Sequence, residues 1–133
     1  MNPTITVLIV DDSVTIRAMM TRVLESDKAI KVVAVGSALE AEAALNVSSF
    51  DVVTLDVEMP GANGLDYLPL LVKRHAAQVI MLSASTGPGA ATRDKARAAG
   101  AAGCFDKAEA VRSASSLIQL VKKVAQKPKR IGL

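Results

Sequence analysis

The chain is poor in aromatic residues and in cysteine. Its 133 residues include two Phe, one Tyr and no Trp, although half of the residues are hydrophobic. A core in this protein must therefore consist mainly of Val, Leu, Ile, Ala and Met. The only cysteine, Cys104, has no partner in the chain for an internal disulfide bond. We interpret Cys104 as a small apolar core residue rather than a redox thiol.

Long apolar runs and targeting signals are also lacking. No apolar stretch approaches the roughly 18 residues that a membrane-spanning helix requires, and the first residues lack the charged and apolar segments of a signal peptide. The net charge is +3, but the basic residues do not form the stripe or patch of a nucleic-acid surface. We therefore predict a cytoplasmic protein that binds neither nucleic acid nor membranes. We expect one domain at residues 1–126, followed by a basic tail or linker at 127–133.

Short apolar stretches alternate with stretches of helical periodicity. The expected strands lie at residues 5–10, 31–35, 51–55, 78–83 and 103–105. The expected helices begin after the N-cap residue Ser13, at residue 38, near Asp66, at residue 90 and at about Ser113, and end near Glu25, Asn46, His75, Ala99 and Gln126. The third helix is placed from Asp66 because Pro69 is tolerated only in a first turn. Five alternations predict a single α/β domain, with a parallel sheet covered by helices on both faces.

Polar side chains follow four of the five expected strands. They are Asp11 and Asp12 after the first strand, Asp56 after the third, Ser83 after the fourth, and Asp106 and Lys107 after the fifth. Right-handed crossovers bring the carboxyl ends of parallel strands to one edge of a sheet, where ligands bind. We therefore expect these side chains to meet in one crevice.

Three carboxylates in one crevice repel one another, by about 4 kcal/mol per pair at 4 Å with an effective dielectric constant near 20. A bound cation would offset this repulsion, and an oxygen-rich site of this kind suits Mg²⁺. Lys107 adds a fixed positive charge and Ser83 a hydroxyl group. These groups are suited to phosphoryl transfer, with a carboxylate as nucleophile and an acyl phosphate as product.

Four segments together resemble the receiver domains of two-component response regulators, over essentially the whole chain. They are Val10-Asp11-Asp12-Ser13, the segment from Leu55 to Gly64, Met81-Leu82-Ser83-Ala84 and Phe105-Asp106-Lys107. The resemblance implies a flavodoxin-like (βα)5 fold, doubly wound, with strand order 2-1-3-4-5. It also implies a protein of a phosphorelay that is not an enzyme, beyond slow self-dephosphorylation.

The resemblance assigns a metal site and a phospho-acceptor. Asp56 corresponds to the phospho-acceptor. Asp12, Asp56 and the backbone carbonyl of Glu58 correspond to the Mg²⁺ ligands, and Asp11 acts through a water molecule on the ion.

The resemblance also assigns a switch and partners. Ser83 corresponds to the switch hydroxyl, Lys107 to the cation that pairs with the phosphoryl group, and Glu58 and Ser85 to positions that tune the lifetime of the phosphorylated state. A histidine kinase or its phosphotransfer domain is the implied donor. An output domain or downstream protein would read the change, at a surface around residues 90–99 and 103–105.

Within this family, the segments Asp11-Asp12-Ser13-Val14, Leu24-Glu25-Ser26-Asp27 and Ser83-Ala84-Ser85-Thr86 are similar to the receiver half of a chemotaxis methylesterase. The chain contains no Gly-x-Ser-x-Gly nucleophile motif for the esterase half. A longer parent chain would have to supply it.

Two positions depart from the family pattern. Ala108 stands where the family has Pro after a cis bond, so we expect either a trans peptide bond that redirects Lys107 or a strained loop. Cys104 stands where the family has its switch aromatic, and Phe105 comes one residue later. Strand alternation predicts that Phe105 points to the opposite face from Cys104.

Two other functions remain open from the sequence. The altered Cys104 and Ala108 are compatible with a receiver-like docking module that is not phosphorylated. A phosphatase with an aspartyl nucleophile is the second alternative, although such an enzyme normally carries Asp where this chain has Glu58.

Overall fold

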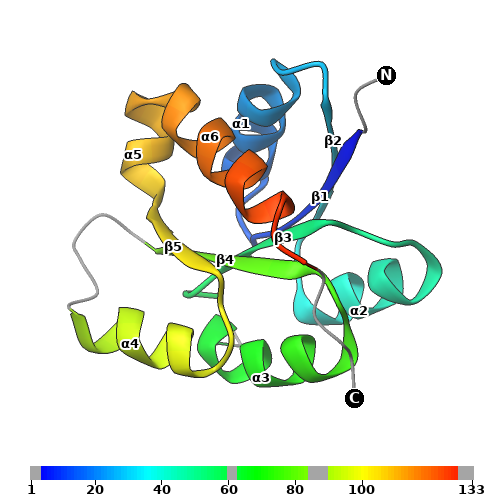
Figure 1. Cartoon of the computed structure of the whole chain (residues 1–133), viewed down its shortest axis with the longest axis vertical. Helices are drawn as coiled ribbons and strands as arrows, with labels where there is room; N and C mark the ends of the chain where they lie inside the picture. Colours follow the sequence, from blue (N-terminus) through cyan, green and yellow to red (C-terminus); the bar gives the residue numbers. More distant parts are fainter. Residues whose placement is uncertain (1–3, 60–62, 84–89, 129–133) are drawn as a thin grey trace.

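The computed structural model describes residues 4–59, 63–83 and 90–128. The described part contains the strands β1 (Ile5–Val10), β2 (Ile30–Val35), β3 (Val52–Asp56), β4 (Gln78–Ser83) and β5 (Gly103–Asp106). Its helices are α1 (Val14–Glu25), α2 (Ala38–Val47), α3 (Gly64–Arg74), α4 (Ala90–Ala98), α5 (Lys107–Arg112) and α6 (Ala114–Ala125). The strands form one parallel sheet in the order β2-β1-β3-β4-β5 (Figure 1). Both the predicted α/β class and the strand order implied by the resemblance are confirmed.

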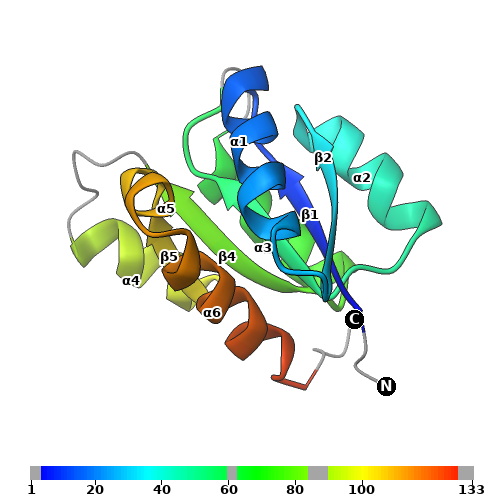
Figure 2. The ribbon, with the colours of Figure 1, turned by 90° about the horizontal axis from the view of Figure 1, so that it is seen from above.

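Helices cover both faces of the sheet, so the domain has three layers. The helices α2, α3 and α4 lie on one face, and α1, α5 and α6 lie on the other (Figure 1). Seen from above, α1 and α6 lie across the near face of the sheet (Figure 2). Each face has its own cluster of buried Val, Leu, Ile, Met and Ala side chains, with few aromatic residues. The aliphatic core expected from the composition is thus present.

The register of the sheet sets the position of its carboxyl edge. Val10 of β1 lies opposite Val35 of β2 and Leu55 of β3, and Ser83 of β4 lies opposite Asp106 of β5. Every residue of β3 is buried, as is typical of a central parallel strand that is covered on both faces. The residues at the ends of β1, β3 and β5 therefore leave the sheet at the same edge.

The start of α3 differs from the sequence prediction. The helix begins at Gly64, not near Asp66, because the Asn63 side chain caps it by accepting a hydrogen bond from the Leu65 N–H at 2.8 Å. Pro69 therefore lies inside the helix and not in its first turn. It has no N–H to donate to the carbonyl one turn earlier, at Leu65.

A short helix that was not expected follows β5. The described residues contain six helices where five were predicted, and the additional one, α5, begins at Lys107. The Asp106 side chain caps it by accepting a hydrogen bond from the Ala108 N–H at 2.8 Å. The N-cap residue Asp106 at the end of β5 thus allows α5 to begin at the next residue. In the described part of the chain, no helix has the length and apolar character needed to cross a membrane.

Candidate functional site

The end of β1 carries two acids with different surroundings. Asp11 is fully buried, whereas Asp12 is exposed. The Asp11 Oδ1 atom accepts a hydrogen bond from the Ser13 N–H at 2.9 Å, and the Ser13 Oγ atom accepts one from the Ile16 N–H at 3.2 Å. These bonds connect the Asp11 carboxylate to the first turn of α1. The strand-to-helix turn therefore determines the direction of this side chain.

Asp56 ends β3 as a buried carboxylate, with 1% of its surface exposed. Its Oδ1 atom accepts a hydrogen bond from the Glu58 N–H at 3.0 Å. Gly64 lies close to the end of β3. A Cβ atom on Gly64 would lie only 2.0 Å from the Asp56 carbonyl oxygen. Only glycine permits this close approach. Gly64 thus allows α3 to begin directly beside the end of β3.

Lys107 connects the two buried acids. Its Nζ atom lies 2.9 Å from Asp11 Oδ2 and 2.9 Å from Asp56 Oδ1. The lysine side chain is 19% exposed and both carboxylates are 1% exposed, so water screens these contacts little. One ammonium group, carried by the first residue of α5, therefore bridges the ends of β1 and β3.

The pKa values of this group reflect burial and charge. Burial raises the pKa of the Asp56 carboxyl group; the hydrogen bonds from Lys107 and from the Glu58 N–H oppose this effect, and the negative charge of Asp11 adds to it. Burial also disfavours the charged form of Lys107. Its hydrogen bonds to both acids outweigh burial and raise the pKa of Lys107. A carboxylate that is costly to ionise thus lies beside a protonated amine.

The three acids at this edge fit a divalent cation. Asp11, Asp12 and Asp56 each offer one carboxylate oxygen, and these atoms lie within 4.8 Å of one another. The Asp56 Oδ2 atom is buried and has no hydrogen-bond partner among the described residues. A buried carboxylate oxygen without a partner is costly, and oxygen ligands of this kind are those that Mg²⁺ prefers. The donor set therefore suits the ion that the sequence led us to expect.

Two further predicted site residues, Ser83 and Glu58, lie at the same edge. Ser83 is half-buried and follows Leu82, which is the register partner of Asp56. Glu58 is exposed, and the bond given above places its backbone N–H, not its side chain, against Asp56. Ser85 lies outside the described residues.

The sequence of this chain matches the model of a known protein family. The model of the response regulator receiver domain matches residues 7–122. The chain belongs to the response regulator receiver family. The receiver resemblance of the sequence is confirmed.

Curated relatives of this receiver domain include protein-glutamate methylesterases/protein-glutamine glutaminases. The protein from Rhizobium etli is 45% identical over 102 residues, which are 76% of this chain and 29% of that protein. One of those from Rhodospirillum rubrum is 41% identical over 130 residues, which are 96% of this chain and 34% of that protein. The receiver domain thus spans about a third of the length of these relatives, and its predicted similarity to the methylesterase receivers is confirmed.

Solved structures of response regulators are similar to this chain in fold. The response regulator domain of Thermotoga maritima CheB superimposes with a TM-score of 0.83 at 32% identity, covering 93% of this chain and 98% of that one. The Vibrio cholerae chemotaxis protein CheY4 superimposes with a TM-score of 0.79 at 26% identity, covering 91% of this chain and 98% of that one.

The two departures from the family pattern have clear structural outcomes. Cys104 packs with the core under α2, α3 and α4, whereas Phe105 packs with the core under α1 and α6, so the predicted opposite orientation is confirmed. Burial raises the pKa of the Cys104 thiol, although the charges of Arg93 and Arg97 act against this shift. No peptide bond among the described residues is cis, which leaves the trans alternative after Lys107. The lysine nevertheless reaches both acids of the receiver site.

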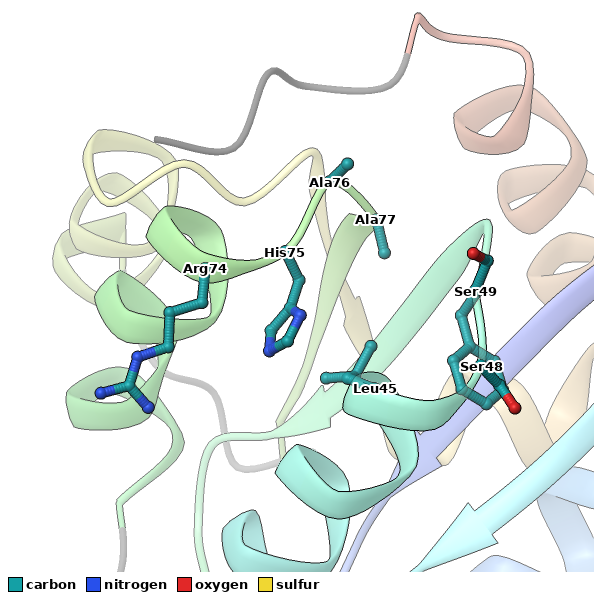
Figure 3. Close-up of a pocket in the computed structure, with 8 residues that line it drawn as sticks. Leu45, Ser48, Ser49, Arg74, His75, Ala76 and Ala77 are labelled. Carbon is teal, nitrogen blue, oxygen red and sulfur yellow. The ribbon is translucent and has the colours of Figure 1, made fainter.

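A pocket of about 180 Å³ lies elsewhere in the receiver (Figure 3). Its lining residues are Leu45, Ser48, Ser49, Phe50, Arg74, His75, Ala76 and Ala77. Phe50 and Ala77 precede β3 and β4, so the pocket lies at the amino edge of the sheet, away from the acids. It is therefore separate from the acidic site.

Two sets of contacts in the receiver were not found from the sequence. Glu42 of α2 accepts hydrogen bonds from Tyr67 and Arg74 and contacts the His75 Nε2 atom at 2.9 Å. No local sequence pattern pairs His75 with Glu42, because the two residues are 33 positions apart. At the acidic site, the Arg17 Nη1 atom donates to the Asp11 carbonyl oxygen at 2.7 Å. No helical spacing indicates that contact, because Asp11 lies outside α1 and six residues before Arg17.

Proposed function

We propose that this protein is a Mg²⁺-dependent receiver domain that accepts a phosphoryl group on Asp56. The observation that carries the proposal is the bridge from Lys107 to the buried Asp11 and Asp56, beside a third acid within 4.8 Å. Three carboxylates this close repel one another, and Lys107 contacts only two of them, so a bound cation would lower the cost of the cluster. Membership of the receiver family supports this function for the cluster.

The two oxygens of Asp56 differ in their contacts. Oδ1 is held by the Glu58 N–H and by Lys107, whereas Oδ2 has no hydrogen-bond partner among the described residues. Because Oδ2 is also the oxygen that suits Mg²⁺, we assign the Asp56 carboxylate, and not one of its oxygens, as the nucleophile. Its electron pair forms the new P–O bond, while the P–N bond of a phosphohistidine breaks and returns its electron pair to the imidazole nitrogen.

The charges around Asp56 would support that transfer. Asp12, Asp56 and the backbone carbonyl of Glu58 are the ligands we propose for Mg²⁺, with Asp11 acting through a water molecule. Bound Mg²⁺ would offset negative charge on the transferring phosphoryl group. Lys107 orients Asp56 before transfer and can then pair with a phosphoryl oxygen. Ser83, at the end of β4, is the hydroxyl that we propose donates to the product.

Partners complete the proposed phosphorelay. A histidine kinase or its phosphotransfer domain supplies the phosphoryl group, and the surface around α4 and β5 passes the change to an output domain or downstream protein. A hollow of about 510 Å³ lies on this surface, lined by residues that include Arg97, Cys104, Leu120, Lys123 and Lys127. Basic side chains around an apolar floor suit a partner segment with acidic and apolar residues.

The similarity to methylesterases makes a protein-glutamate methylesterase the output that we propose, in the context of chemotaxis. We also propose that the receiver itself is not an enzyme, beyond slow self-dephosphorylation. It acts in the cytoplasm and extends over residues 1–126, with 127–133 as a tail.

The test is incubation with Mg²⁺ and acetyl phosphate, followed by intact mass measurement. We expect one phosphoryl adduct on the wild type and on Asp66→Asn, a matched loss of an exposed acid in α3, and none on Asp56→Asn. A wild type without an adduct contradicts the proposal and favours a docking module. Continuous release of phosphate from varied esters contradicts it in favour of a phosphatase.

A further inference from the structure

Arg17 of α1 reaches back to the acidic end of β1. Its backbone N–H donates to the Ser13 carbonyl at 2.9 Å in the first turn of the helix. Its Nη1 atom donates to the Asp11 carbonyl oxygen at 2.7 Å. The side chain is half-buried. Among the residues that the structure describes, this hydrogen bond joins the Arg17 guanidinium to the acidic site.

The remaining polar groups of Asp11 are already held. Its N–H donates to the Val35 carbonyl at 3.1 Å, its Oδ1 atom accepts from Ser13, and its Oδ2 atom contacts Lys107 at 2.9 Å. The carbonyl oxygen of Asp11 is the one further polar group, and it accepts the hydrogen bond from Arg17. It belongs to the peptide plane between Asp11 and Asp12, so its hydrogen bond with Arg17 restrains the backbone dihedral angles on both sides of that plane, including the φ angle of Asp12.

Gly36, just after β2, fixes the place of the guanidinium from the other side. A Cβ atom at Gly36 would lie 2.9 Å from Arg17 Nη1 and 3.5 Å from Arg17 Cζ. A side chain at position 36 would therefore require the flexible guanidinium of Arg17 to shift. The Gly36 N–H donates to Glu40 Oε1 at 3.0 Å, which anchors this turn to α2.

We propose that Arg17, packed against Gly36, is a positioning residue that holds the Asp11–Asp12 peptide so that both carboxylates face the cation site. This inference rests on the proposed function, because it concerns the same site. The positioning by Arg17 would strengthen Mg²⁺ binding, whereas the positive charge of Arg17 would weaken it. A positive charge near the acids repels Mg²⁺, so its removal alone would tighten Mg²⁺ binding. Loss of positioning would instead weaken it.

The test is calorimetric titration of the full chain with Mg²⁺. We expect Arg17→Met to weaken Mg²⁺ binding by about tenfold, at the lower end of the effect of residues that orient metal ligands. Arg17→Lys keeps the charge but lacks the planar group, and is expected to restore binding only in part. Gly36→Ala keeps both charge and side chain and is expected to weaken binding as Arg17→Met does. Arg22→Met, an exposed basic residue of the same helix, is the control and should bind like the wild type.

The double variant Arg17→Met/Gly36→Ala gives the most specific result. Because the Gly36 methyl group acts by displacing Arg17, it should have no further effect once Arg17 is absent. Additive losses would contradict the inference. So would unchanged or tighter Mg²⁺ binding in Arg17→Met. A change only in the stability of the metal-free protein would show a structural role and would also contradict it.

A second measurement separates this inference from the proposed function. Amide NMR spectra of the metal-free variants report the Asp12 and Ser13 N–H groups directly. Both signals should move in Arg17→Met and in Gly36→Ala, but not in Arg22→Met. A wild type that binds no Mg²⁺ would overturn the proposed function, whereas unmoved amide signals would overturn the positioning by Arg17.

Discussion

At the residue scale, one ammonium group balances the charge of the acidic site. Lys107 contacts Asp11 and Asp56, each at 2.9 Å, while Asp12 remains exposed. Two unit charges 4 Å apart interact by about 4 kcal/mol at an effective dielectric constant near 20, so the site depends on this lysine when no metal ion is bound. A bound cation would share that role.

Replacement of Lys107 by Met tests this balance. Without divalent cations, we expect the free energy of unfolding to fall by about 2 kcal/mol, because hydrogen bonds to charged groups contribute roughly 1.5–3 kcal/mol. Mg²⁺ should bind the variant several-fold more tightly, since the competing charge is gone. Urea unfolding with and without Mg²⁺ measures both effects.

Lys122→Met is the matched control for that variant. Lys122 pairs with Asp27 while 42% exposed, and exposed pairs contribute less than about 1 kcal/mol. This variant should lose little stability and gain nothing from Mg²⁺ beyond the wild type. Equal effects of Mg²⁺ on the two variants would show that Lys107 does not compete with the cation.

Glu42 gives a pH-dependent prediction at the same scale. Burial alone would raise the pKa of Glu42, but hydrogen bonds from Tyr67, Arg74 and His75 outweigh it and lower the pKa. A carboxyl group with a lowered pKa in the folded state stabilises the fold above its unfolded pKa, and this contribution disappears as the pH falls through the folded value. We expect Glu42→Gln to destabilise the protein by about 1 kcal/mol at pH 7.

Urea unfolding from pH 7 down to pH 3 measures this effect. The difference between wild type and Glu42→Gln should shrink as the pH falls below the ordinary range of glutamate. Glu109→Gln, which removes an exposed pair with Arg112, should show no such trend. A difference that grows on acidification would refute the assignment.

At the element scale, the contact between β3 and α3 sets the geometry around Asp56. A Cβ atom at Gly64 would meet the Asp56 carbonyl at 2.0 Å, and backbone cannot move aside as a side chain can. We expect Gly64→Ala to destabilise the protein by about 2 kcal/mol, within the range for overpacking. This loss exceeds the gain of up to about 1 kcal/mol in helix propensity.

Gly103→Ala is the control for Gly64→Ala, again by urea unfolding. A Cβ atom at Gly103 would meet only Leu120 side-chain atoms, at 3.8 Å and 4.0 Å, which is ordinary contact. Its unfolding free energy should stay within about 0.5 kcal/mol of the wild type. Similar losses in both variants would contradict the role given to Gly64.

The strands and their acidic ends were predictable from the sequence, because the patterns that mark them are local. Apolar runs that stop at Asp11 and Asp56 signal both a buried strand and a ligand edge. Cap residues are also local signals. Asn63 marks the start of α3 and Asp106 marks the start of α5, but the predicted elements included neither helix start. Contacts between distant residues, such as Tyr67 with Glu42, depend on the packing of helices and leave no local signal.

At the scale of the whole molecule, the sheet separates the acidic site from other features of the surface. The acids lie at its carboxyl edge, and the pocket beside His75 lies at its amino edge. The hollow near Cys104 borders β5 and α6. Gln78, at the start of β4, donates to the Pro128 carbonyl at 2.7 Å and holds the chain beyond α6 against the amino edge. A change at Asp56 must therefore pass through the sheet or its loops to reach these surfaces.

The proposed function requires a divalent cation among Asp11, Asp12 and Asp56. The melting temperature as a function of Mg²⁺ concentration tests this binding most directly. At 100 times the dissociation constant, a ligand stabilises the fold by about 2.7 kcal/mol, which is several degrees for a domain of this size. We expect this rise in the wild type and its absence in Asp12→Asn and Asp56→Asn. Without Mg²⁺, Asp56→Asn should melt above the wild type, because burial raises the pKa of Asp56 and makes its charge costly. A wild type whose melting temperature ignores Mg²⁺ would contradict the account.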